Sequence, residues 1–335
     1  MSAPRRLWLI VPWALFVVAT IGWISYWFYV AGQAEARLTA WAQREISRGG
    51  EASFAPIRRH GFPVLMRLEI PNLVYAPRGD GWRAETDRAD LHIDLLNPQH
   101  VILKAEAPIS VRRENGDVSV LQAEALIASI ETGARGLVQA GVDGNGVSLD
   151  DPQKEGVLRA ARLVGTIRPD PRAEGDYQFA FEATDVALPR PVRSFEQFGL
   201  GVARLRAAIV LTHGGALLQS AEDDPLGPWR DAGGRLRFEA LEFDWGPLVT
   251  TGSGDIGIDT ERRLSGTLTL PIEEPAAIFT ALANNPDADA NARQALGLLA
   301  AGYMLSGDGI TLDVEAANGV LRLEGLGVRT LPAVY

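Results

Sequence analysis

One short run of the sequence combines residue types that can bind a divalent metal ion. Asp90, His92 and Asp94 alternate with apolar residues, and alternate residues of a β-strand point to the same face. Carboxylate oxygens and imidazole nitrogens gathered on one face could ligate a metal. The simpler interpretation is a solvated face, opposite a face that carries Leu91 and Ile93. We therefore expect no metal site, and we expect that replacing Asp90 and His92 leaves the fold intact.

Two glycine-containing stretches have the outline of ligand-binding loops. Residues 252–257 fit the pattern G-x-G-x-x-G, but a dinucleotide site needs a helix directly after it. Residues 258–270 instead continue as a strand, so a glycine-tolerant strand is expected. Residues 143–146 resemble the start of a calcium loop, but Val147 and Ser148 stand where a ligand and a glycine are needed. A turn is expected there.

No catalytic constellation is apparent in the sequence. The nucleophile elbow, the metalloprotease helix and the phosphate-binding loop are all missing. Cysteine is absent, which excludes disulfides, thiol catalysis and cysteine-bound zinc. A site built from scattered carboxylates stays open, but we expect neither enzyme activity nor a cofactor. The net charge of −10 opposes a phosphate backbone, so nucleic acid is not expected as a partner.

The N-terminal stretch predicts a membrane anchor, assigned to residues 1–34. Leu7 to Val30 carries no charged residue, and as a helix it would extend about 36 Å, enough to cross a hydrocarbon layer of about 30 Å. Aromatic rings favour the interface between membrane and water. The tryptophans of this stretch lie towards its two ends: Trp8, Trp13, Trp23 and Trp27.

The alternative for this stretch is a signal peptide that is removed. Residues 34–36 read Ala-Glu-Ala, the form of a cleavage site, but a signal peptide's apolar region spans only about 7–15 residues. A retained anchor is favoured. Arg5 and Arg6 favour a cytoplasmic N-terminus, although Arg37 and Arg44 lie close on the other side. We expect a single pass through the inner membrane, with the body in the periplasm.

The body, residues 35–335, is expected to be mostly β. A helix continues from the membrane with Ala34, Leu38 and Trp41 on one stripe, and Gly49-Gly50 ends it. Beyond it, period-two alternation dominates. The clearest alternating runs are residues 64–70, 91–95, 101–103, 177–181, 236–245, 264–270 and 310–314. Within residues 236–245 the alternation slips between Phe238 and Leu241, which predicts a β-bulge.

Turn residues and two short helices complete the predicted layout. Asn115-Gly116 and Asn318-Gly319 separate alternating runs, a strong hairpin signal that implies antiparallel strands. Residues 274–305 are predicted to form a helical insert of two helices. The polar stretch 220–234 is a loop and a weak candidate domain boundary. The predicted fold is therefore mainly β, with one transmembrane helix and a curled antiparallel sheet that forms an open groove or closes into a sandwich or barrel.

A sheet of this size has an apolar face that must be covered. The few expected helices cannot cover it. If the sheet stays open, the bulky side chains are expected to line an apolar groove that could hold a lipid. The residues expected there are Phe179, Phe181, Phe238 and Phe243. If the sheet closes on itself, the chain is instead a scaffold for an envelope complex. The expected partners are a membrane and either a lipid or an envelope protein.

The order of several short motifs resembles a known family. An anchor is followed by Gly61-Phe62-Pro63 before a strand and by Asn97-Pro98 after one. Asp244-Trp245 then leads into a glycine-rich hairpin, the helical insert and the closing hairpin at Asn318. This layout resembles the bacterial envelope family called domain of unknown function 2125, for which no functional residues are defined. More loosely, it is similar to AsmA-like proteins of the Gram-negative inner membrane, a similarity that implies a lipid-holding groove.

The first prediction concerns the anchor. Because the apolar stretch is longer than a signal peptide's, we expect it to be retained. The intact mass of protein extracted from membranes should be that of the full chain. A mature protein that begins at Arg37 would show that a peptidase removes the stretch.

Overall fold

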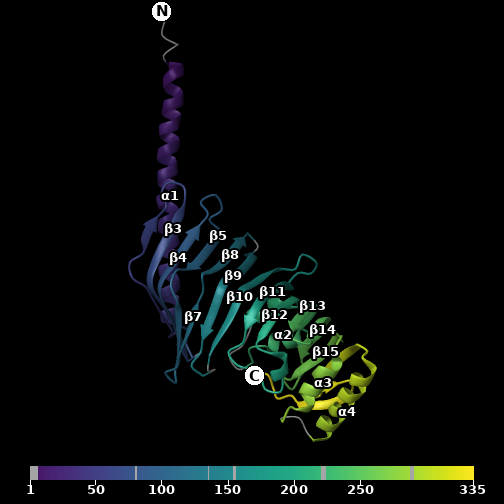
Figure 1. Ribbon diagram of the computed structural model, residues 1–335. Helices are drawn as coiled ribbons and strands as arrows, with labels where there is room; N and C mark the ends of the chain where they lie inside the picture. Colours follow the sequence, from purple (N-terminus) through teal and green to yellow (C-terminus); the bar gives the residue numbers. More distant parts are fainter. Residues whose placement is uncertain (1–6, 80, 135, 154–155, 220–223, 287–289) are drawn as a thin grey trace, which may run out of the picture. The chain divides into compact units, whose positions relative to one another are not determined.

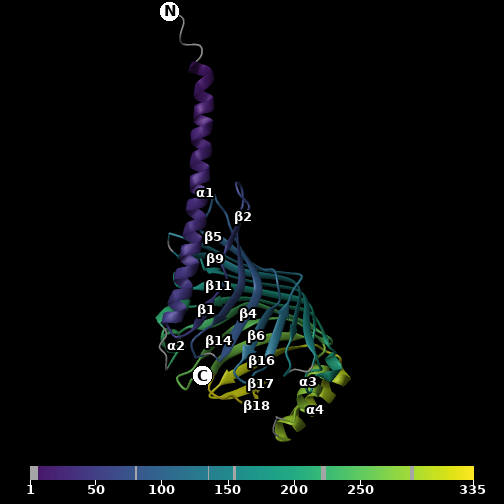
Figure 2. The same cartoon turned by 90° about the vertical axis from the view of Figure 1, so that its left-hand side faces the viewer.

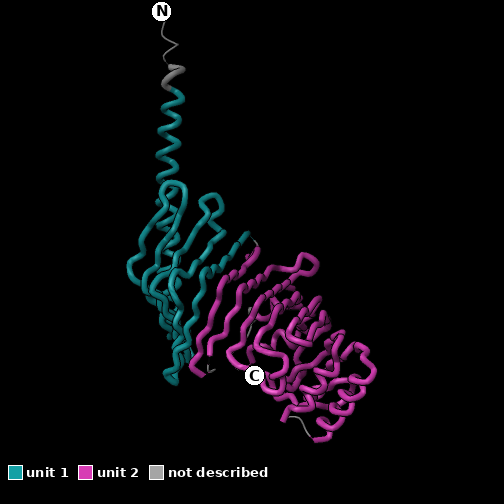
Figure 3. The backbone as a smooth tube through the Cα atoms, viewed as in Figure 1, with its two compact units in different colours: residues 1–135 teal, residues 136–335 magenta. Residues whose placement is uncertain are grey.

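The computed structural model describes residues 7–79, 81–134, 136–153, 156–219, 224–286 and 290–335. The chain divides into two compact units, unit 1 (residues 1–135) and unit 2 (residues 136–335) (Figure 3). Both units are built mainly from antiparallel strands (Figure 1), which confirms the predicted mainly β fold. The weak boundary near residues 220–234 stays a prediction, and residues 220–223 lie outside the described residues.

Unit 1 consists of one long helix and a group of antiparallel strands. Its elements are α1 (Leu7–Ser47), β1 (Glu51–Ser53), β2 (Arg58–His60), β3 (Met66–Ala76), β4 (Trp82–Ile93), β5 (His100–Ala105), β6 (Ile109–Arg113), β7 (Val118–Gln122) and β8 (Ala125–Gly133). Strands β1 and β2 both pair with β3, which pairs with β4. One half of β4 pairs with β5 and the other with β6. β8 then follows β5, and β7 follows β6.

The helix α1 continues without a break from the apolar stretch into the body (Figure 2). It is the one helix in the described part of the chain that is long and apolar enough to cross a membrane. Its later turns pack on the sheet of unit 1, where Trp27, Val30 and Ala31 are buried together with Met66 and Leu68. The helix ends at Ser47, as predicted, because glycine at position 49 adopts the left-handed conformation (φ +89°) that stops a helix.

Unit 2 is a meander in which each strand pairs antiparallel with the next, from β9 to β18. Its strands are β9 (Gly136–Asp150), β10 (Val157–Pro169), β11 (Tyr177–Ala187), β12 (Gly201–Leu211), β13 (Arg235–Trp245), β14 (Leu248–Ile258), β15 (Leu264–Ile272), β16 (Ile310–Ala317), β17 (Val320–Leu323) and β18 (Leu326–Thr330). Its helices are η1 (Glu196–Phe198), η2 (Gly214–Gln219), α2 (Gly227–Asp231), α3 (Pro275–Ala283) and α4 (Ala290–Ser306). The last two lie where the helical insert was expected.

Helices α3 and α4 cover one end of the sheet of unit 2. Phe279, fully buried on α3, stacks on Tyr303 of α4 with ring centroids 5.6 Å apart. The same core contains Ile272 and Leu312 from the strands, and Trp245 at the end of β13. This end of the sheet therefore has a filled core.

The two predicted Asn-Gly hairpins have different turn geometries. Asn318 (φ 51°) and Gly319 (φ 72°) are both left-handed, as a type I′ turn between β16 and β17 requires. Between β6 and β7, only Gly116 has positive φ, and its N–H donates to the Arg113 carbonyl oxygen. The same dipeptide is accommodated there by a longer loop.

The bulge predicted between Phe238 and Leu241 is confirmed by the register of β13 on β14.

The two glycine-containing stretches are both strands. Residues 252–257 lie inside β14, where a side chain at Gly254 would collide with the carbonyl oxygen of Thr267 on β15. Glycine is needed there for close strand pairing. Residues 143–146 lie inside β9 and pair with β10, so the expected turn is wrong. The sheet ladder overrides the turn preference of Asn and Gly at this point.

The prediction that Asp90 lies on a solvated face of β4 is wrong. Its side chain is fully buried, on the face opposite Leu91. Its carboxylate lies 3.2 Å from a guanidinium nitrogen of Arg88 and 3.6 Å from one of Arg67. Arginine stems cover the carboxylate while their charged ends reach water. Glu69, directly across on β3, is also buried. The face of the unit 1 sheet opposite Leu91 therefore carries a cluster of ion pairs whose carboxylates are buried.

We predict that Asp90→Ala destabilises the fold by about 1–3 kcal/mol, because charge-assisted hydrogen bonds are lost and a cavity replaces the carboxylate. The control is Asp87→Ala, an exposed carboxylate on the same strand, which should change stability by less than about 0.5 kcal/mol. Chemical unfolding of the detergent-solubilised chain measures both values. Equal unfolding midpoints for the two variants would show that the buried cluster does not stabilise unit 1.

Candidate functional site

One face of the sheet in unit 1 is a continuous apolar surface. The strand register aligns Leu68, Leu91, Leu103 and Ala128 in one row from β3 to β8. The neighbouring row contains Met66, Ile93, Val101 and Ile130. Side chains in such rows share a face of the sheet. The sequence therefore builds a broad apolar surface from strands that alternate with period two.

Helix α1 covers only part of this face. Under the helix, Met66 and Leu68 are at most 1% exposed, whereas Leu103 is 37% and Ile130 45% exposed. The apolar side chains are fully covered in the first half of β3, and this cover is lost towards β5 and β8. Large apolar side chains left this accessible within a sheet face mark a surface that can take a ligand or partner.

A cavity of about 410 Å³ lies between α1 and strands β4 and β5. It falls within the usual size range of ligand sites, about 300–1,000 Å³. The helix contributes Tyr26, Tyr29, Val30, Gln33, Ala34, Arg37, Leu38 and Trp41, and the strand side contributes Leu91, Ile93, Pro98 and Val101. The stripe of Ala34, Leu38 and Trp41 predicted from the sequence thus faces this cavity.

A second cavity of about 230 Å³ adjoins the first on the same face, and its lining is almost wholly apolar. Trp41, in the first cavity, packs against Tyr75, in the second, with ring centroids 5.6 Å apart. Leu91 and Leu103, one from each lining, are paired across β4 and β5. We name the two cavities together the unit 1 groove. The second is lined by Leu73, Tyr75, Ala84, Glu85, Thr86, Ala89, Leu103, Ala105, Ile109, Leu126 and Ala128.

Three side-chain hydrogen bonds hold α1 against the loops at one end of the sheet. The indole N–H of Trp23 donates to the Pro63 carbonyl oxygen at 2.7 Å, and that of Trp27 donates to Leu65 at 3.0 Å. The Tyr26 hydroxyl donates to the Leu95 carbonyl oxygen at 2.8 Å. The Trp27 ring is buried and the Trp23 and Tyr26 rings are half-buried, and each satisfies its polar atom with a hydrogen bond. These bonds fix the helix at a set height along the strands.

An ion pair fixes the helix further along. Arg59 on β2 donates two hydrogen bonds to the carboxylate of Glu35, at 2.6 and 2.7 Å. The hydrogen bond from Arg59 lowers the pKa of Glu35, and the same bond raises the pKa of Arg59. A bidentate pair of this kind sets geometry as well as charge. It keeps one wall of the unit 1 groove in place.

The chemistry of the unit 1 groove is that of apolar binding. Its walls are mainly aliphatic and aromatic. The polar residues are Gln33 and Arg37 on the helix side and Glu85 and Thr86 on the strand side. Among the described residues, no group of three or more His, Asp or Glu side chains is placed to hold a metal ion. An elongated apolar molecule with a polar end fits this arrangement.

The four phenylalanines expected to line a groove all lie on one face of the sheet in unit 2. Phe179 pairs with Ile209, which pairs with Phe238, and Phe181 lies in the adjacent row. Phe179 is 37% exposed, and Phe181 and Phe238 are half-buried. Phe243 lies towards the filled core, edge-on to Trp245 at 6.0 Å. Whether these residues line a groove stays a prediction.

Sequence reasoning missed the unit 1 groove. Its strands were recognised, but the wall supplied by α1 depends on where the helix lies. That position is fixed by contacts distant in sequence, such as the hydrogen bonds of Trp23, Tyr26 and Trp27 and the Glu35–Arg59 ion pair. The signal in the sequence was the cluster of aromatics from residue 23 to residue 29. A preference for the membrane interface accounts for the same residues, so the cluster alone does not predict that they hold the helix on the sheet.

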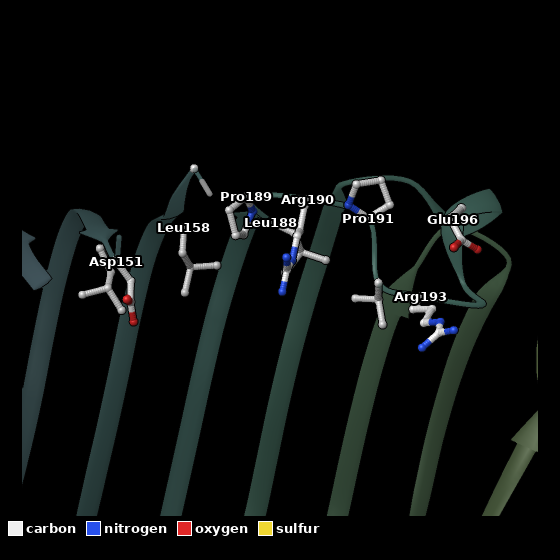
Figure 4. A pocket seen from close by; sticks show the side chains of 11 residues that line it. Asp151, Leu158, Leu188, Pro189, Arg190, Pro191, Arg193 and Glu196 are labelled. Atoms are coloured by element: carbon white, nitrogen blue, oxygen red, sulfur yellow. The ribbon is translucent and has the colours of Figure 1, made fainter. Parts of the chain in front are cut away.

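Unit 2 has a further cavity of about 800 Å³ at the ends of β9, β10 and β11, shown in Figure 4. Leucine and proline side chains line it together with charges of both signs. Arg190 and Arg193 are exposed, and Asp151 and Glu196 bring carboxylates to the same rim. Residues 154–155, next to it in the chain, lie outside the described residues. The mixed charges do not favour one class of ligand.

The comparisons with known proteins place the chain in a family. No curated protein and no solved structure matches it. A family model described as "uncharacterized protein conserved in bacteria" matches residues 27–332, which include the later turns of α1 and every strand from β1 to β18. The chain therefore belongs to this bacterial family, DUF2125.

Proposed function

We propose that this protein is a single-pass protein of the bacterial inner membrane whose periplasmic body binds a lipid in the unit 1 groove. The observation that carries the proposal is the open, almost wholly apolar cavity over β5 and β8, which joins a cavity walled by α1. A lipid acyl chain has the shape and chemistry of this site.

The energetics favour such a ligand. Each methylene moved from water into an apolar site contributes about 0.8 kcal/mol, so ten methylenes would contribute about 8 kcal/mol before the cost of binding is subtracted. The exposed side chain of Leu103, which lines the groove, would lose contact with water at the same time. Binding would therefore bury apolar surface that the protein fold alone leaves in contact with water.

The course of α1 supports a membrane source for the ligand. The helix runs without interruption from its apolar stretch to the residues that line the groove, Tyr26 to Trp41. A groove wall that continues a membrane-spanning helix begins where the hydrocarbon layer ends. A lipid would reach the groove without a long path through water.

A second candidate function is a scaffold that docks an envelope protein. Helix α4 is apolar on its outer side as well as its inner side, with Leu298, Met304 and Leu305 each at least 66% exposed. An exposed apolar stripe of this kind is a usual feature of protein contact sites. Lipid content separates the two functions, because a scaffold needs none.

We predict that the full chain, purified in detergent, carries lipid that native mass spectrometry detects. Leu103→Asp combined with Ala128→Asp should abolish this loading, because a carboxylate in an apolar channel must be desolvated. Both positions lie in one row of the groove face.

The matched control is Ser129→Asp, one residue along β8 on the opposite face of the sheet. It adds a carboxylate beside Ala128 on the same strand and should leave the lipid content unchanged. A wild-type protein free of lipid would favour the scaffold. Loss of lipid in the control as well would place the ligand elsewhere or show general unfolding.

The expected groove of unit 2 has its own test. Phe179→Asp with Phe181→Asp should reduce lipid loading if that face also holds a chain. The control pair is Gln178→Glu with Ala180→Glu, which alternates onto the other face of β11. Unchanged loading in the phenylalanine variant would restrict the ligand to the unit 1 groove.

A further inference from the structure

Two loops at one end of unit 1 expose large apolar side chains. Residues 61–65 join β2 to β3, and residues 94–99 join β4 to β5. The exposed fractions are 50% for Phe62, 70% for Val64, 70% for Leu65 and 86% for Leu96. Four such side chains on neighbouring loops exceed the scattered exposure that is normal for a soluble surface.

Both loops are fixed beside the apolar part of α1. The hydrogen bonds of Trp23 and Trp27 end on carbonyl oxygens of the first loop, and that of Tyr26 ends on Leu95 in the second. Phe62 also packs edge-on against the Trp27 ring at 5.6 Å. The tips of the loops therefore lie level with residues 23–27 of the helix.

That level falls inside the uncharged stretch of α1, which runs to Val30 and beyond. Trp23 lies seven residues before Val30, about 10 Å along the helix axis. A helix that spans the bilayer with this stretch places residues 23–27 at the interface or just within it. Residues 61–66 and 95–99 are all uncharged, so the tips carry no charge that would oppose entry. Asp94, at the start of the second loop, accepts a hydrogen bond from the Leu96 N–H at 2.9 Å.

We propose that these two loops insert into the membrane interface and dock unit 1 on the bilayer. The surface is the apolar tip formed by Phe62, Val64, Leu65 and Leu96, and its partner is the lipid bilayer itself. The inference rests on the part of the proposed function in which α1 spans a membrane. The first cavity of the unit 1 groove includes Tyr26, Pro98 and Val101, so docking holds that end of the groove at the lipid surface.

Because the chain lacks cysteine, single cysteines can report the depth of each position. Four variants of the full chain carry an environment-sensitive fluorophore: Val64→Cys, Leu96→Cys, Phe16→Cys and Glu124→Cys. Each is reconstituted in vesicles of phosphatidylethanolamine and phosphatidylglycerol that contain lipids spin-labelled near the headgroup or near the end of the acyl chain. Val64 and Leu96 have largely exposed side chains, so labelling preserves the fold.

Labels at positions 64 and 96 should lose most of their emission to spin labels near the headgroup and little to aqueous iodide. The label at 124 is the control on the body. It lies in the β7–β8 turn, beside Leu126, which pairs with Ala105 at the end of β5 far from the docking loops. Iodide should quench this label and the spin-labelled lipids should not.

The label at 16, in the middle of the apolar stretch, separates the two possible failures. Quenching at 16 by spin labels deep in the bilayer, with iodide quenching at 64 and 96, would overturn the docking of the loops and leave the anchor intact. Iodide quenching at 16 as well would overturn the spanning helix and the docking together. Lipid quenching at 64 and 96 but not at 124 is the result that supports the inference.

Discussion

A broad antiparallel sheet with one apolar face requires cover, and the architecture of this chain follows from how little of that cover it contains. In unit 1 the cover comes from α1, which packs over β3 and leaves Leu103 and Ile130 accessible. In unit 2 it comes from α3 and α4, which pack around Phe279 at one end of the meander. Unit 1 therefore combines a filled core with a stretch of open apolar face, and in unit 2 the filled core lies at one end of the sheet. The open stretch is where an apolar ligand gains most by binding.

The helix α1 has two roles that different residues serve. Its early residues suit a hydrocarbon environment, whereas Trp27, Val30 and Ala31 form a protein core with Met66 and Leu68. Polar atoms at Trp23, Tyr26 and Glu35 then attach it to the loops and to β2. Because one element supplies both an apolar segment of membrane-spanning length and a groove wall, the proposed anchoring would set the position of the groove relative to the bilayer through covalent structure as well as packing.

Much of the fold was predictable from alternation and turn chemistry. The period-two runs identified strands in both units, the phase slip at Phe238 located a bulge, and Asn318-Gly319 located a type I′ turn. Failures occurred where tertiary contacts outweighed local preference. Asn145 and its flanking glycines lie in a strand because β10 pairs with them. Asp90 is buried because arginines on β3 and β4 cover it, and no local pattern reveals that. The groove of unit 1 needed the position of α1, which depends on contacts between residues some 40 or more positions apart.

The unbroken course of α1 from Leu7 to Ser47 has a mechanical consequence. A helix with no hinge between bilayer and body transmits its tilt to whatever is fixed to its later turns. Hydrophobic mismatch changes helix tilt, since a stretch longer than the local hydrocarbon thickness leans to fit. With residues 23–27 at the interface, as in the proposed docking, the uncharged helix before Trp27 extends about 30 Å, which matches a hydrocarbon layer of about 30 Å. In that arrangement a thinner membrane would make the helix lean and would rotate unit 1 with it, so that the orientation of the groove would depend on bilayer thickness.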